Sequence, residues 1–142
     1  MKIAVRYQSR GGNTKAVAEA IANTAGTKAE PIDVPISEPV DHLFIGGGVY
    51  ALNIDRSLKE YLEKLSPDTV KSLAAFTTCG NIGATGKIID IAKTKGITVC
   101  ENDLSIKMRL KNYRLFGGQG NVTLSEKHLR AIADFVKDVT NA

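Results

Sequence analysis

A short loop near the start of the chain combines residue types that can bind a phosphate group. Residues 9–14 read Ser-Arg-Gly-Gly-Asn-Thr and lie between an apolar run and a segment with helical periodicity. Hydroxyl and amide side chains donate hydrogen bonds to phosphate oxygens, and adjacent glycines let backbone N–H groups come close to an anion. The start of a helix also favours a negative charge, because the helix dipole is positive there. We therefore predict a phosphate cradle made by Ser9, Arg10, Gly11, Gly12, Asn13 and Thr14.

The pattern of this loop narrows the kind of phosphate that it can hold. It lacks both the G-x-x-x-x-G-K-[ST] pattern of nucleoside triphosphatases and the G-x-G-x-x-G pattern of dinucleotide-binding folds. A single phosphomonoester group is therefore the better match. The alternative is a glycine-rich turn that only joins a strand to a helix.

Apolar periodicity predicts that strands and helices alternate along the chain. Strands are predicted at 2–8, 30–36, 42–45, 73–77 and from 97 onward, and helices over 16–25, 54–65, 84–92 and 123–139. The strands read as continuous apolar runs, which is typical of a parallel sheet covered by helices on both faces. The fold class is therefore α/β, and a length of 142 residues predicts a single domain, 1–142.

Three details of this prediction concern the ends and faces of elements. Pro31 and Pro35 favour an edge position for the second strand. Only residues 37–41 remain to connect it with the third strand, so either the crossover helix is reduced to a turn or the second strand is placed too late. In the last helix, Thr123 and Glu126 predict a capping box. The buried stripe predicted for that helix consists of Leu129, Ile132, Ala133, Val136 and Val139.

Three loops follow the carboxyl ends of predicted strands. They span residues 9–14, 46–53 and 78–83, and all are rich in Gly, Asn, Ser or Thr. An open α/β sheet binds its ligands beyond the carboxyl ends of the strands, where the strand order reverses. We therefore expect the three loops to form one site.

The first loop and the helix after it resemble the flavodoxin family, whose phosphate loop has the form T/S-x-T-G-x-T. Ser9, Gly12 and Thr14 match this pattern, whereas Gly11 stands where the family usually carries a hydroxyl, so that Arg10 is a candidate to replace one phosphate contact. The resemblance covers nearly the whole chain in element order. It implies a flavodoxin-like three-layer sandwich with a five-stranded parallel sheet in the order 2-1-3-4-5, and FMN as the cofactor.

The resemblance also implies that the second and third loops hold the flavin ring. The residues assigned to this role are Gly47, Gly48, Val49, Tyr50 and Ala51 in the second loop, and Thr78, Cys79, Gly80 and Asn81 in the third. The chain has no Trp, so Tyr50 is the candidate for stacking on the ring, and ordinary packing under the loop is its alternative role. The third loop has no aromatic residue and would contact the flavin through backbone amides and Asn81.

The cysteines do not predict a metal site. Cys79 and Cys100 are far apart in the sequence and have no neighbouring Cys or His at metal-ligand spacing. Cys79 is either a small packed side chain or a thiol that reacts beside the flavin. A C-x-x-x-x-x-R phosphatase loop is excluded because Thr85 stands at the position of the required arginine.

The positive charge of the chain is concentrated in one segment. Nineteen Lys and Arg against fifteen Asp and Glu give a net charge of +4, and residues 105–120 contain four cations without any acid. These cations are Lys107, Arg109, Lys111 and Arg114. Residues 105–111 alternate apolar and cationic residues, which predicts a strand with one cationic face. This basic segment indicates a docking patch for an acidic redox partner or a site for an anionic substrate, and protection of a sheet edge is the alternative.

The combined observations predict an FMN-binding redox protein that transfers electrons between protein partners. A second hypothesis is an FMN-dependent oxidoreductase acting on a quinone or a nicotinamide. A third is RNA binding through residues 105–120, where Tyr113 and Phe116 lie among the cations and Gly117-Gly118-Gln119 matches the tripeptide of peptide release factors. Localised charge argues against a general nucleic-acid binder. No apolar run reaches membrane-spanning length, so we expect a cytoplasmic protein.

Overall fold

The computed structural model describes most of the chain, with gaps in the loops. The described residues are 1–8, 12–47, 49–50, 53–54, 56–78, 83–100, 103–106 and 124–141, and at 49–50, 53–54 and 83–84 the description is limited to the backbone. Several residues singled out from the sequence lie outside these ranges, namely Ser9, Arg10, Gly11, Gly48, Ala51, Cys79, Gly80, Asn81, Lys107, Arg109, Lys111, Arg114 and Thr123.

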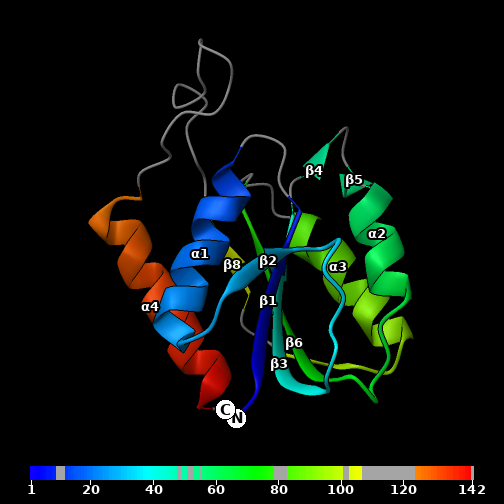
Figure 1. Ribbon diagram of the computed structural model, residues 1–142. Coiled ribbons are helices and arrows are strands. Elements are labelled where there is room, and N and C mark those ends of the chain that lie inside the picture. The colour runs from blue at the N-terminus through cyan, green and yellow to red at the C-terminus, as the bar shows by residue number, and fades with distance from the viewer. Residues whose placement is uncertain are drawn as a thin grey trace.

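A parallel sheet forms the middle layer (Figure 1). Its strands are β1 (Ile3–Tyr7), β2 (Ala29–Pro31), β3 (Val40–Gly46), β6 (Val70–Thr77), β7 (Thr98–Val99) and β8 (Leu104–Ser105). Along the sheet the order is β2-β1-β3-β6-β7, and β8 also pairs with β6. The predicted order 2-1-3-4-5 is therefore confirmed, with β6 as the fourth strand and with β7 and β8 as two short pieces of the fifth.

Four helices cover the two faces of the sheet within the described part of the chain. They are α1 (Asn13–Ala25), α2 (Arg56–Glu63), α3 (Gly83–Thr94) and α4 (Glu126–Thr140). One apolar core lies between the sheet and α1 with α4, and contains Phe44, Phe76 and Phe135. The other lies between the sheet and α2 with α3, and contains Leu43, Leu58 and Leu73. The alternating side chains of the strands thus fill two cores, which confirms the three-layer sandwich.

The ends of α1 and α4 show where local signals were reliable and where they were not. Gly26 ends α1 in the left-handed conformation, with φ of 78°, as its position after the apolar pattern suggests. The capping box predicted at Thr123 is wrong, because the side chain of Ser125 caps α4 by accepting a hydrogen bond from the backbone N–H of His128 (3.2 Å). Ser125 directly precedes the first helical residue, where a hydroxyl side chain can accept from a free backbone N–H of the first turn.

The buried face of α4 also differs from the predicted stripe. Leu129 is 47% exposed and Ala133 is exposed, whereas Phe135 is buried. The buried residues of α4 recur at steps of three, one and three, which defines one helix face. They are Ile132, Phe135, Val136 and Val139. Phe135 packs edge-on against Phe44 of β3, with ring centroids 5.5 Å apart, and this contact sets which face of α4 turns inward.

The connection between β2 and β3 contains no helix. β2 begins at Ala29 and ends at Pro31, so the strand predicted at 30–36 is too long and placed too late, while its predicted edge position is confirmed. The connection 32–39 crosses the α2 side of the sheet as a strap that begins with a turn. Arg6 of β1 is buried beneath it and donates hydrogen bonds from Nε to the carbonyl of Val34 (2.9 Å) and from Nη2 to that of Pro35 (3.2 Å). One buried arginine therefore holds the strap where a crossover helix would otherwise cover the sheet.

The second loop contains a short hairpin that the sequence did not predict. β4 (Val49–Tyr50) and β5 (Asn53–Ile54) pair antiparallel, with Val49 opposite Ile54 and Tyr50 opposite Asn53. Two-residue strands are too short to show an alternating pattern.

None of the helices in the described part of the chain combines the length and the apolar character that crossing a membrane requires.

Candidate functional site

The three predicted loops begin at the same edge of the sheet, because β1, β3 and β6 are in register. Tyr7 pairs with Gly46, and Gly46 pairs in turn with Phe76. The backbone N–H of Gln8 donates to the carbonyl of Gly46 (3.0 Å), which extends the pairing one residue beyond β1. The chain reverses its strand order between β1 and β3, and ligands bind at such a point, a rule for which flavodoxins are a standard example.

The helix start next to this edge is suited to an anion. Gly12 is the N-cap of α1 with φ of 91°, a left-handed conformation that glycine adopts without strain, and none of the described side chains caps the helix start. No acidic residue lies in the first turn. The first N–H groups of a helix have no partner within the helix, and the dipole there is positive. The predicted residues Gly12 and Asn13 thus lie where a phosphate cradle requires them.

A hydrogen bond between two buried hydroxyl groups joins the first loop to the third. The Oγ1 atoms of Thr14 and Thr78 are 3.1 Å apart, and the residues are only 3% and 8% exposed. Thr14 lies in the first turn of α1, and Thr78 follows β6 directly. Because each hydroxyl has one proton and two lone pairs, the pair keeps hydrogen-bonding capacity beyond this single contact.

Close packing explains the glycines that open the second loop. A Cβ added at Gly46 would overlap the ring of Phe76, and one added at Gly47 would overlap Leu58 of α2. Both residues are buried. The second loop therefore leaves the sheet pressed against its neighbours, and only glycine fits at these two positions without movement.

A second threonine contact lies at the start of α3. The buried hydroxyl of Thr85 donates to the carboxylate of Asp103, which lies directly before β8. This bond ties the first turn of the helix after the third loop to the outer strand. No local pattern predicts this pair, since the two residues are distant along the chain and neither belongs to a motif.

The structure brings together part of the predicted site. Five of the predicted residues lie at the same edge, where the strands end: Gly12, Asn13, Thr14, Gly47 and Thr78. The backbones of Val49 and Tyr50 form β4 of the hairpin. The remaining predicted cofactor contacts, namely Ser9, Arg10, Gly11, Gly48, Ala51, Cys79, Gly80 and Asn81, lie outside the described residues and stay predictions, as do those for the four cations of the basic segment.

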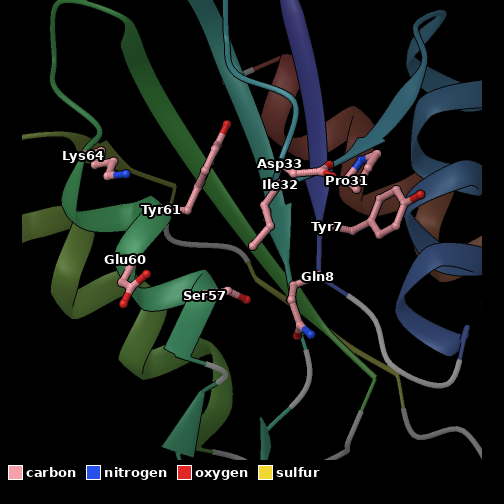
Figure 2. A pocket seen from close by; sticks show the side chains of 9 residues that line it. All are labelled: Tyr7, Gln8, Pro31, Ile32, Asp33, Ser57, Glu60, Tyr61 and Lys64. Carbon is pink, nitrogen blue, oxygen red and sulfur yellow. The ribbon is translucent and has the colours of Figure 1, made fainter.

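A cavity of about 420 Å³ lies between the strap and α2 (Figure 2). Its lining residues are Tyr7, Gln8, Pro31, Ile32, Asp33, Ser57, Glu60, Tyr61 and Lys64. Burial raises the pKa of the Tyr61 phenol above its usual value of 10.0, and the positive charge of Arg6 opposes part of this effect. Three separate segments form the cavity, so no local pattern in the sequence predicts it.

A sequence model of the flavodoxin domain matches residues 4–129. The chain belongs to the flavodoxin family. A flavodoxin of Streptococcus pneumoniae superposes with a TM-score of 0.65 at 11% identity, over 98% of this chain and 97% of that one. A two-electron reduced flavodoxin of Megasphaera elsdenii superposes with a TM-score of 0.60 at 14% identity, over 95% and 98% of the two chains. At such identities the likeness is one of fold.

The flavodoxin fold also occurs within larger proteins. The flavodiiron core of Flv1 from Synechocystis sp. PCC6803 superposes with a TM-score of 0.65 at 14% identity, over 98% of this chain but only 36% of that one. No curated protein sequence matched the chain. Family membership and fold are therefore established by the domain match and by the superpositions.

The described residues of this flavodoxin fit the phosphate end of FMN. Among the described residues, no side chain caps the start of α1 and none in its first turn is acidic, and Gly46 and Gly47 place no side chain where the second loop begins. Gln8 directly precedes the first loop and belongs to no motif in the sequence. Its side chain lies on the α2 side of the sheet, next to Gly47, and its Oε1 atom is buried without a hydrogen-bond partner in the described part of the chain.

Proposed function

We propose that this flavodoxin binds FMN and transfers electrons between protein partners. The observation that carries the proposal is the start of α1, whose N-cap is a glycine in the left-handed conformation and whose first turn is tied to the third loop by the bond between Thr14 and Thr78. When bound, FMN supplies the electron transfer itself. The chain supplies binding, orientation and the electrostatic surroundings.

Each loop has its own role in this proposal. The first loop binds the phosphate through backbone N–H groups at the start of α1 and through hydroxyl groups such as that of Thr14. The second and third loops enclose the flavin ring, with Tyr50 of the hairpin stacking on it and Thr78 holding the first loop against the third. No general acid, general base or nucleophile is required from the chain.

The proposed partner is a redox protein with an acidic docking face, in the cytoplasm. The support is the charge of the sequence, in which the four cations of the basic segment account for the whole excess of +4. Charge complementarity of this kind raises the rate of association, and salt reduces this acceleration because it screens the charges. Electron transfer to an acidic-faced partner should therefore slow steeply as ionic strength rises, while transfer to a basic-faced one should not.

A flavin titration tests the central proposal. Purified flavin-free protein is titrated with FMN and, in parallel, with riboflavin, while flavin fluorescence and absorption are recorded. FMN should bind more tightly than riboflavin, because only FMN carries the phosphate that the start of α1 holds. Absence of any change in the FMN spectrum or fluorescence would refute FMN binding, and equal affinity for both flavins would refute the assignment of the cradle.

The cavity beside Gln8 favours a second candidate function, an FMN-dependent oxidoreductase acting on a quinone or nicotinamide. A volume of about 420 Å³ at the edge where the loops begin is large enough for a small substrate. Steady-state turnover of FMN-loaded protein with a reduced nicotinamide and a quinone separates the two functions. A carrier shows little turnover without its protein partners, whereas an oxidoreductase shows sustained turnover.

A further inference from the structure

The cavity between the strap and α2 exists because the connection between β2 and β3 has no helix. It lies on the face of the sheet covered by α2 and α3, whereas the start of α1 belongs to the opposite face. Its volume of about 420 Å³ falls within the range of small-molecule pockets. A binding site here is distinct from the phosphate cradle, although both adjoin the end of β1.

The walls of the cavity form an apolar slot with a polar end. Tyr61 of α2 and Ile32 of the strap lie on opposite sides of the slot, and Ser57 points toward it from α2 (Figure 2). The carboxamide of Gln8 lies toward the end where the loops begin, while the ring of Tyr7 points away toward α1. A slot between an aromatic ring and an aliphatic side chain favours a flat ligand.

One polar atom at the end of the slot lacks a partner. Gln8 Oε1 is buried and has no hydrogen-bond partner among the residues that the structure describes. Buried polar groups in proteins are nearly always hydrogen-bonded, so each such exception needs an explanation. A carboxamide both accepts and donates, and it is matched by a ligand edge that carries an N–H and a C=O side by side.

The charged groups at the mouth nearly cancel. Asp33 and Glu60 are acidic, Glu60 is paired with Arg56 (3.2 Å), and Lys64 is the cation among the described lining residues. Arg6, the guanidinium behind the cavity, is already bonded to the carbonyls of the strap. The cavity therefore has no built site for a phosphate or carboxylate group.

We propose that this cavity binds an uncharged, flat ring carrying an amide-type N–H and C=O edge. The ring lies between Ile32 and Tyr61, and the edge pairs with the carboxamide of Gln8. Nicotinamides and pyrimidine bases share this chemistry. The proposal does not depend on FMN binding, because the slot and the cradle use different faces of the sheet.

An NMR titration of the full-length protein tests the proposal, once without flavin and once saturated with FMN. The probes are benzamide and benzoate, which have the same shape but differ in the group that faces Gln8. Benzamide should shift the backbone amide signals of Ile32 and Tyr61 and bind at least about tenfold more tightly than benzoate, as expected for one matched hydrogen bond to a buried group. Equal affinities would overturn the proposal. Nicotinamide and uracil, titrated in the same way, distinguish the two natural sources.

Two variants locate the binding. Ser57→Phe fills the slot from an exposed helix position and should weaken benzamide binding at least about tenfold, whereas Lys59→Phe, an exposed position outside the lining, should leave it unchanged. Gln8→Leu removes the carboxamide at similar volume, and should weaken benzamide binding without lowering thermal stability. Unchanged benzamide affinity in both Ser57→Phe and Gln8→Leu would overturn the proposal.

Discussion

The hydroxyl oxygens of Thr14 and Thr78 lie 3.1 Å apart, so one hydrogen bond joins the first turn of α1 to the residue that follows β6. Two of the three loops at the candidate site thus share a buried contact. The position of the first loop therefore depends on the third, although 64 residues separate the two threonines along the chain.

Thr78→Val removes one hydroxyl of this pair. The buried hydroxyl of Thr14 then loses its hydrogen bond to residue 78. We expect the free energy of unfolding to fall by about 1–2 kcal/mol, and FMN to bind about tenfold more weakly. Urea denaturation and fluorescence titration measure the two effects. Thr78→Ser keeps the hydroxyl and should retain most of the FMN affinity. If valine and serine had the same effect, the hydroxyl would have no role.

Gly46→Ala places a Cβ against the ring of Phe76 in the middle of the sheet. Overpacking of this kind should lower the free energy of unfolding by about 1–3 kcal/mol, measured by urea denaturation. The control is Gly86→Ala in α3, where a Cβ meets nothing within 4 Å and should raise stability by about 0.5–1 kcal/mol. In a Phe76→Leu background, Gly46→Ala should cost less. An undiminished cost there would contradict the clash.

Arg6→Met removes the guanidinium that holds the strap. The carbonyls of Val34 and Pro35 then lose their hydrogen bonds from this side chain. Stability should fall by about 2–4 kcal/mol, because hydrogen bonds to charged groups are among the stronger ones. Hydrogen exchange should accelerate at the amide of Val34, which donates to the carbonyl of Pro31 (3.0 Å). Arg56→Met, in an exposed ion pair, should change stability by less than about 1 kcal/mol. Protection at Val34 equal to wild type would show that the strap is held by other contacts.

The buried phenol of Tyr61 makes stability depend on pH in the alkaline range. The pKa of this phenol is raised in the folded protein. Its contribution to the free energy of unfolding is therefore fully present below the usual pKa of 10.0 and is lost as the pH rises above that value. Tyr61→Phe should therefore remove part of the alkaline destabilisation. Denaturation curves between pH 8 and pH 11, about the range that brackets this titration, measure it. Identical pH slopes in the two proteins would contradict the assignment to Tyr61.

The sequence predicted those parts of the fold that depend on local patterns. The strand that became β1 and the helix that became α1 carry clear apolar periodicity, and Gly26 marks the end of α1. The phosphate cradle stays a prediction from consecutive residues, of which Gly12, Asn13 and Thr14 lie at the start of α1. The strand order came from the flavodoxin resemblance rather than from any pattern.

Features that depend on contacts between distant segments could not be predicted in this way. A strap held by Arg6 takes the place of a crossover helix. Predicting it would require knowing that the Arg6 side chain contacts the carbonyls of residues 34 and 35. Leu129 continues the apolar spacing of α4 toward its N-terminus, so the pattern within that helix could not show that this residue is 47% exposed. The bonds between Thr14 and Thr78 and between Thr85 and Asp103 likewise join segments that only the fold brings together.

The position of β1 between β2 and β3 has a consequence for how the protein is made. β1 pairs with β2 and β3, both of which follow it in the chain, and its register with β3 runs from Ile3 opposite His42 to Tyr7 opposite Gly46. During synthesis from the N-terminus, β1 therefore leaves the ribosome well before its partner β3 exists. Such non-local pairing slows folding. Until residue 46 has emerged, the apolar strand β1 therefore has only the short strand β2 to pair with.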